Sequence, residues 1–108
     1  SGLGDILRSA LSPLSAQIAA AFVYGSVAKR QDTARSDIDV MVVSDSLGYA
    51  ELFSALEPAT TSLGRVANPT LLTTANISKR RAQDSAFVTR VLDQPKIWLI
   101  GNEATLNA

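Results

Sequence analysis

The sequence predicts an α/β (α+β) fold in which helices pack against a small mixed sheet of about four strands. Residues 18–24 and 38–43 are short apolar segments with β-branched or aromatic side chains, which indicates strands buried on both faces. Segments with apolar residues three and four positions apart surround these strands, as is typical of amphipathic helices. The chain has 108 residues, so we expect one domain over residues 1–108. A start at Ser1 rather than Met is expected of a segment of a longer protein.

The first half of the chain is predicted to hold two helices and two strands. A helical stripe that begins at Leu3 should end near Pro13, because proline disfavours helical geometry in the residue before it. Gly25 and Ser26 then break the strand expected at residues 18–24. The elements expected after this break are a short helix at 27–30, a polar loop at 31–36 and a strand at 38–43.

The second half is predicted to continue the alternation. A helix with Leu47, Ala50, Phe53 and Leu56 on its buried face should end near Pro58 or continue to a closing glycine at position 64, since glycine favours helix C-termini. The remaining expected elements are a strand at 66–73, helices at 76–83 and from Ser85 to Pro95, a strand at 96–100 and a loose tail at 102–108. Pro69 favours an edge position for the strand at 66–73, because proline cannot donate a hydrogen bond to a neighbouring strand.

Composition excludes several kinds of site and partner. Ten basic residues balance ten acidic ones, which excludes binding through bulk positive charge, so we expect no direct nucleic-acid binding by this domain. The sequence has no Cys and no His, which excludes disulfides, a Ser-His-Asp triad and a conventional zinc site. Any metal should therefore be a hard cation held by carboxylates. No apolar segment approaches the roughly 20 residues of a membrane helix, and no signal peptide is recognisable, so a cytoplasmic location is expected.

The residues that carry chemistry lie in one stretch, FVYGSVAKRQDTARSDIDVMVV. Gly25 lets the backbone approach a ligand closely, and a helix that starts at Ser26 would offer free N–H groups to a phosphate. Asp37 and Asp39 stand two positions apart on a strand, so their carboxylates should share one face while Ile38 points to the other. Two adjacent carboxylates repel each other unless a cation lies between them. The pattern therefore predicts a site for Mg²⁺ and a nucleoside triphosphate.

This stretch resembles the signature of the polymerase-β-like nucleotidyltransferases, and it looks specifically like the minimal nucleotidyltransferase-domain proteins. It is also similar to the catalytic half of aminoglycoside nucleotidyltransferases. The resemblance implies that Gly25, Ser26 and Lys29 bind the triphosphate, with Lys29 where the family usually has Arg. It implies that Asp37 and Asp39 are catalytic residues that hold Mg²⁺. The implied reaction transfers a nucleoside monophosphate from a triphosphate, ATP first among them, to a hydroxyl acceptor and releases pyrophosphate.

One part of the family pattern is missing. Active members carry a third carboxylate on the next strand, whereas residues 66–73 contain no acid, and the positions nearest in register are Asn68 and Thr70. Two interpretations therefore stay open: an enzyme, or a catalytically silent binding or regulatory module such as an antitoxin-like protein or the effector domain of a transcription regulator. A minimal domain also lacks an acceptor pocket, so a homodimer or a partner protein is expected to complete the site.

The other charged and aromatic residues are interpreted without a role in chemistry. The basic run at residues 79–81 is expected on a solvated helix face, and Trp98 and Tyr24 are expected in the core. Arg35 could contact phosphate or pair with Asp32, and the sequence leaves both interpretations open.

Overall fold

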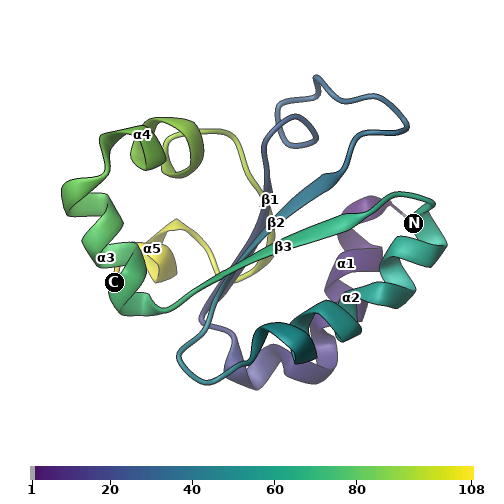
Figure 1. The fold of residues 1–108 in the computed structure, drawn as a ribbon, viewed down its shortest axis with the longest axis horizontal. Coiled ribbons are helices and arrows are strands. Elements are labelled where there is room, and N and C mark those ends of the chain that lie inside the picture. The colour runs from purple at the N-terminus through teal and green to yellow at the C-terminus, as the bar shows by residue number, and fades with distance from the viewer. Residues whose placement is uncertain (1) are drawn as a thin grey trace.

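Figure 1 shows a twisted sheet between two layers of helices in the computed structural model, which describes residues 2–108. Helices α1 and α2 cover one face, and α3, α4 and α5 cover the other. The helices and helical turns are α1 (Leu3–Leu11), η1 (Ser12–Gln17), α2 (Tyr49–Leu63), α3 (Thr74–Gln83), α4 (Ser85–Phe87), η2 (Val88–Leu92) and α5 (Glu103–Leu106). The strands are β1 (Ala20–Tyr24), β2 (Ile38–Val43), β3 (Ala67–Leu72) and β4 (Ile97–Ile100).

The sheet is mixed and has four strands in the order β3-β2-β1-β4, which confirms the predicted fold class. Strand β1 runs antiparallel to both β2 and β4, and β2 runs parallel to β3. Pro69 lies on β3, at an edge of the sheet, as predicted. The N–H of Ala67 on that strand donates to the Thr60 hydroxyl of α2 (3.1 Å).

The α1–α2 face holds the larger apolar core. Alternate residues of a strand point to opposite faces of the sheet, and Ile38, Val40 and Val42 of β2 all pack on this side with no exposed surface. Leu7 and Leu11 of α1 meet them from the helical layer, also without exposed surface. Nothing polar from β2 enters this face.

The opposite face buries its apolar residues at one end of the strands. Phe22 and Met41 are buried there beneath Ile77 of α3 and Phe87 of α4. Two residues of the basic run at 79–81 contact other side chains or backbone of this layer. The Arg80 guanidinium lies 4.9 Å from the centroid of the Phe87 ring, and Arg81 donates to the Leu106 carbonyl at 3.2 Å.

Helix α2 differs from its prediction in the face it buries. It passes through Pro58 without a break, and Gly64 closes it in the left-handed conformation. Its buried residues are Leu52, Leu56 and Ala59, whereas Phe53 is 45% exposed and stacks on Tyr49. Of the residues predicted to be buried, Leu47 and Leu56 are buried, whereas Ala50 and Phe53 are exposed. Leu47 precedes the helix and is buried from the loop, so a helical period counted from Leu47 was wrong for Ala50 and Phe53.

The C-terminal segment is ordered rather than loose, which corrects the prediction. The Asn102 side chain accepts a hydrogen bond from the Thr105 N–H and caps α5. Leu106 is buried against the α3–α4 layer, and Glu103 forms an ion pair with the buried Lys96 ammonium (2.9 Å). Burial of Leu106 explains why this short helix stays docked.

Over the described residues, no helix is both long and apolar enough to cross a membrane.

Candidate active site at the end of strands β1 and β2

The turn after β1 brings Gly25 directly against Asp39 of β2. Gly25 has a left-handed φ of 75°, and a Cβ atom at this position would lie 2.6 Å from Asp39 Oδ2. A side chain there would therefore be strained and would also collide with the carboxylate. Gly25 and Asp39, which are 14 positions apart in the sequence, are therefore in direct proximity in the fold.

Residues 25–31, which we call the glycine turn, replace the short helix predicted at 27–30. The Lys29 N–H donates to the Gly25 carbonyl, four residues back, as in an α-helix. The Arg30 N–H then donates three residues back, to the Val27 carbonyl, and the Gln31 N–H donates five residues back, to the Ser26 carbonyl, so the helical pattern is lost. Arg30 also adopts a left-handed φ of 58°. A left-handed residue ends a right-handed helix, so only one turn forms. Val27 is buried in the α1–α2 core and anchors it.

The glycine turn keeps the donors that a helix N-terminus would provide. Within the described part of the chain, the N–H groups of residues 26, 27 and 28 donate to no acceptor. Ser26 is half-buried, and Lys29 has an exposed side chain. Successive free N–H groups in a tight turn form a concave anion site, so the turn can receive phosphate oxygens.

Asp37 and Asp39, which we call the carboxylate pair, stand at the start of β2. The strand begins at Ile38, so Asp37 lies just before it and is exposed, while Asp39 is half-buried. Partial burial raises the pKa of the Asp39 carboxyl, and the negative charge of Asp37 raises that pKa further. The two carboxylates are therefore within electrostatic reach, and Ile38 packs on the opposite face.

Polar side chains flank Asp39 on both neighbouring strands. Asp39 is in register with Tyr24 of β1 and with Asn68 of β3, and Met41 is in register with Thr70. The Tyr24 hydroxyl reaches across β2 to within 3.4 Å of Thr70 Oγ1. Paired residues of adjacent strands point to the same face, so these side chains share the face of Asp39 and none of them is an acid.

The donor set fits a hard divalent cation. Magnesium is typically held by one or two carboxylates together with substrate phosphates rather than by a full protein cage. The carboxylate pair beside the glycine turn meets that description. Residues 2–108 contain no group of three or more acidic, His or Cys side chains placed to hold a metal. On β3, Asn68 and Thr70 are in register with Asp39 and Met41 of β2, at the positions where the sequence predicted that a third acid is missing.

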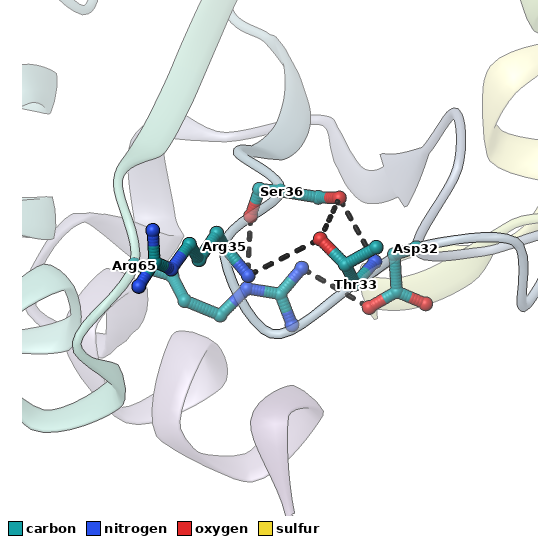
Figure 2. A network of polar contacts seen from close by, with 5 residues as sticks. All are labelled: Asp32, Thr33, Arg35, Ser36 and Arg65. Carbon is teal, nitrogen blue, oxygen red and sulfur yellow. Dashed lines mark hydrogen bonds and ion pairs between the residues drawn. The ribbon is translucent and has the colours of Figure 1, made fainter.

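A network of polar contacts holds the loop between the glycine turn and the carboxylate pair (Figure 2). The Ser36 hydroxyl accepts from the Thr33 N–H at 2.9 Å, and the Ser36 N–H donates to the Thr33 carbonyl at 3.1 Å. Arg65 donates to the Ser36 carbonyl at 2.8 Å and to Asp32 at 3.1 Å. Asp32 therefore pairs with Arg65 and not with Arg35, which decides against one of the two interpretations of Arg35.

Sequence reasoning missed two residues near this site. Tyr24 packs, partly buried, against the core that contains Phe22, in keeping with the prediction, but its hydroxyl lies on the face of the sheet that carries Asp39. Arg65 was assigned no role, because its partners are 29 and 33 positions away in the chain. No local pattern signals a contact at that separation.

Comparisons with known proteins agree with this geometry. The family model described as polymerase beta, nucleotidyltransferase, matches residues 9–94. A search of the curated proteins finds no match.

Several solved structures share the fold at low identity. A toxin–antitoxin crystal structure with AMP-PNP superposes with a TM-score of 0.65 and 15% identity, covering 96% of this chain and 77% of that one. The MntA–HepT toxin–antitoxin complex gives a TM-score of 0.57 at 14% identity, with 97% and 75% covered. The structure of a tri-AMPylated Shewanella oneidensis HEPN toxin in complex with an MNT antitoxin gives a TM-score of 0.56 at 14% identity, covering 94% of this chain and 72% of that one.

Proposed function

This chain belongs to the polymerase beta nucleotidyltransferase family, and we propose that it transfers a nucleoside monophosphate from a Mg²⁺-bound triphosphate to a hydroxyl acceptor. The observation that carries the proposal is the close approach of Gly25 to Asp39, since a Cβ atom on residue 25 would lie 2.6 Å from Asp39 Oδ2. It sets free backbone donors beside the carboxylate pair. A phosphate chain and its cation need these two features side by side.

Each half of the site has a distinct task in this proposal. The free N–H groups of the glycine turn and the Ser26 hydroxyl bind phosphate oxygens, and the exposed Lys29 adds positive charge. Asp37 and Asp39 hold the cation, which neutralises charge on the triphosphate when bound. The acceptor oxygen attacks the α-phosphorus, the bond to the β-phosphate oxygen breaks, and pyrophosphate leaves while the acceptor proton passes to solvent.

Calorimetric titration with ATP tests the binding half of this proposal. Binding should require Mg²⁺ and should be lost in Asp39→Asn, whereas Asp93→Asn removes an exposed aspartate outside the site and should leave it unchanged. Ser26→Ala should weaken binding roughly tenfold or more, since a hydrogen bond to a charged group is worth about 1.5–3 kcal/mol. Equal affinity in Mg²⁺ and in EDTA would contradict the proposal.

A second candidate function is a catalytically silent nucleotide-binding module. The observation that favours it is the register of β3, which places Asn68 opposite Asp39. A general base typically contributes about 10²–10⁴-fold to a rate, and an amide cannot act as one. The experiment measures nucleotide transfer by the wild type and by Asn68→Asp. Transfer by the wild type supports the enzyme, whereas transfer by Asn68→Asp alone supports a silent module that lacks only the acid.

We propose ATP as the nucleotide and a hydroxyl of a partner protein in the cytoplasm as the acceptor. The structures with AMP-PNP and with an AMPylated toxin support this choice, although their low identity establishes only the shared fold. A second copy of this chain is the other candidate acceptor. Incubation with ATP labelled at the α-phosphate should label a co-purified partner, and label on the chain itself would favour the homodimer.

A further inference from the structure

The backbone of Asp37 is held on both sides by one connection, the segment between α2 and β3. The carbonyl of Ser36, one residue before Asp37, accepts a hydrogen bond from Arg65 Nε at 2.8 Å. The N–H of Ile38, one residue after it, donates to the Val66 carbonyl at 2.8 Å. Two consecutive residues, Arg65 and Val66, therefore bracket the first member of the carboxylate pair.

Arg65 has the burial and the partners of a fixed group. Its side chain is 13% exposed, and its second bond, to Asp32 Oδ2 at 3.1 Å, reaches the other end of the same loop. Asp32 and Ser36 enclose the hydrogen-bonded turn around Thr33 (Figure 2). One guanidinium thus spans the turn, a geometry that the planar fork of arginine permits and a single ammonium does not.

From these contacts we infer that Arg65 is a positioning residue for the carboxylate pair: it fixes the backbone that presents Asp37 to the cation. The inference rests on the proposed function and adds to it a residue outside the glycine turn and the pair. Asp37 itself stands before the first residue of β2 and is exposed, so the sheet alone does not hold it. Removing a group that orients a metal ligand through a hydrogen bond typically lowers metal affinity about 10–100-fold.

The chain offers a matched control for Arg65. Arg8 also donates to a carboxylate and to a backbone carbonyl, those of Asp5 and Trp98, both at 2.8 Å. Trp98 lies on β4, at the opposite edge of the sheet from β3. Loss of Arg8 therefore removes the same kinds of bond without touching the loop that carries Asp37.

The experiment measures Mn²⁺ affinity by the loss of the free-ion electron paramagnetic resonance signal, with the metal alone and no nucleotide. Arg65→Gln should weaken Mn²⁺ binding about tenfold or more, and Arg8→Gln should leave it unchanged. Arg65→Lys keeps the charge but loses the two-bond fork, so its affinity should fall between those of the wild type and Arg65→Gln. If Arg65→Gln does not fold, Asp32→Asn releases the guanidinium from one end and should weaken binding in the same direction.

A double-mutant comparison separates positioning from general stabilisation. In an Asp37→Asn background, Arg65→Gln should cause no further loss of Mn²⁺ affinity, because Arg65 acts through Asp37. An equal loss in both backgrounds, or wild-type affinity in Arg65→Gln, would overturn the inference while leaving the proposed function intact. A wild-type chain that binds Mn²⁺ no better than Asp37→Asn would overturn both.

Discussion

The two faces of the sheet differ in where their apolar cover ends. On the α1–α2 face, burial of β2 continues to its first residue, Ile38. On the α3–α5 face, the paired residues Phe22 and Met41 are buried, and the next pair along, Tyr24 and Asp39, is half-exposed and polar. The α1–α2 face, which we call the closed face, is therefore buried along the whole of β2. The α3–α5 face, which we call the open face, carries the polar side chains of the candidate active site at the end of β1 and the start of β2.

The difference between the two faces arises because neighbouring residues of a strand alternate between them. Ile38 and Asp39 are neighbours in sequence but point to opposite faces. Substitution of Ile38 should therefore change the free energy of unfolding and not binding, whereas substitution of Asp39 should remove the binding of metal and nucleotide.

The largest expected effect is on the closed face. Ile38→Ala should lower the free energy of unfolding by about 2–5 kcal/mol, because the side chain is fully buried and its loss leaves a cavity. Urea denaturation measures this loss. Mg²⁺-dependent ATP affinity of the folded fraction should stay at the wild-type value, and a parallel loss of affinity would show that the two faces are coupled.

The next effect sharpens the comparison at the glycine turn. Gly25→Ala should cost about 1–2 kcal/mol of stability for its left-handed backbone, and it should also displace the Asp39 carboxylate and weaken Mn²⁺ binding. Gly101→Ala is the control, since Gly101 has nearly the same φ (76°) but its Cβ would meet Ala19 and Thr105 instead. Thermal denaturation should report a loss for both variants, and only Gly25→Ala should lose metal affinity.

A third prediction uses the charge on the open face. The pKa of Asp39 is raised in the folded state by burial and by Asp37, so its ionised form opposes folding, and stability is lost as pH rises from the ordinary carboxyl pKa through the raised one. Without metal, Asp39→Asn should be more stable than the wild type at neutral pH. The two melting temperatures should converge in acid, and Mg²⁺ should stabilise only the wild type. Wild-type stability that exceeds that of Asp39→Asn at neutral pH without metal would contradict this.

The smallest expected effect concerns the contact that crosses the open face. Tyr24→Phe removes one long hydroxyl contact, 3.4 Å to Thr70, and should cost about 0.5 kcal/mol, at the low end for a hydrogen bond. Equilibrium denaturation, with Thr70→Val as the companion variant, measures it. A loss of ATP affinity in Tyr24→Phe without a loss in Thr70→Val would instead place the phenol in contact with the nucleotide.

The sequence by itself determined the four strands, the main helices and the spacing of the site residues. Short runs such as residues 38–43 identified buried strands, since an apolar run of that length suits a strand covered on both faces. Pro69 predicted the edge strand correctly because its missing N–H is a property of the residue alone. The alternation of Asp37, Ile38 and Asp39 likewise follows from the two-residue period of any strand.

Only the tertiary structure decided which contacts complete these elements. Asp32 pairs with Arg65 rather than with Arg35, and the Tyr24 hydroxyl meets Thr70, because the sheet order brings β3 beside β2 and within reach of β1. The tail after Asn102 forms a helix because Leu106 finds a buried place against the α3–α4 layer. Local propensity and period act over a few residues, whereas these contacts depend on where distant segments of the chain meet, and that depends on the packing of the whole core.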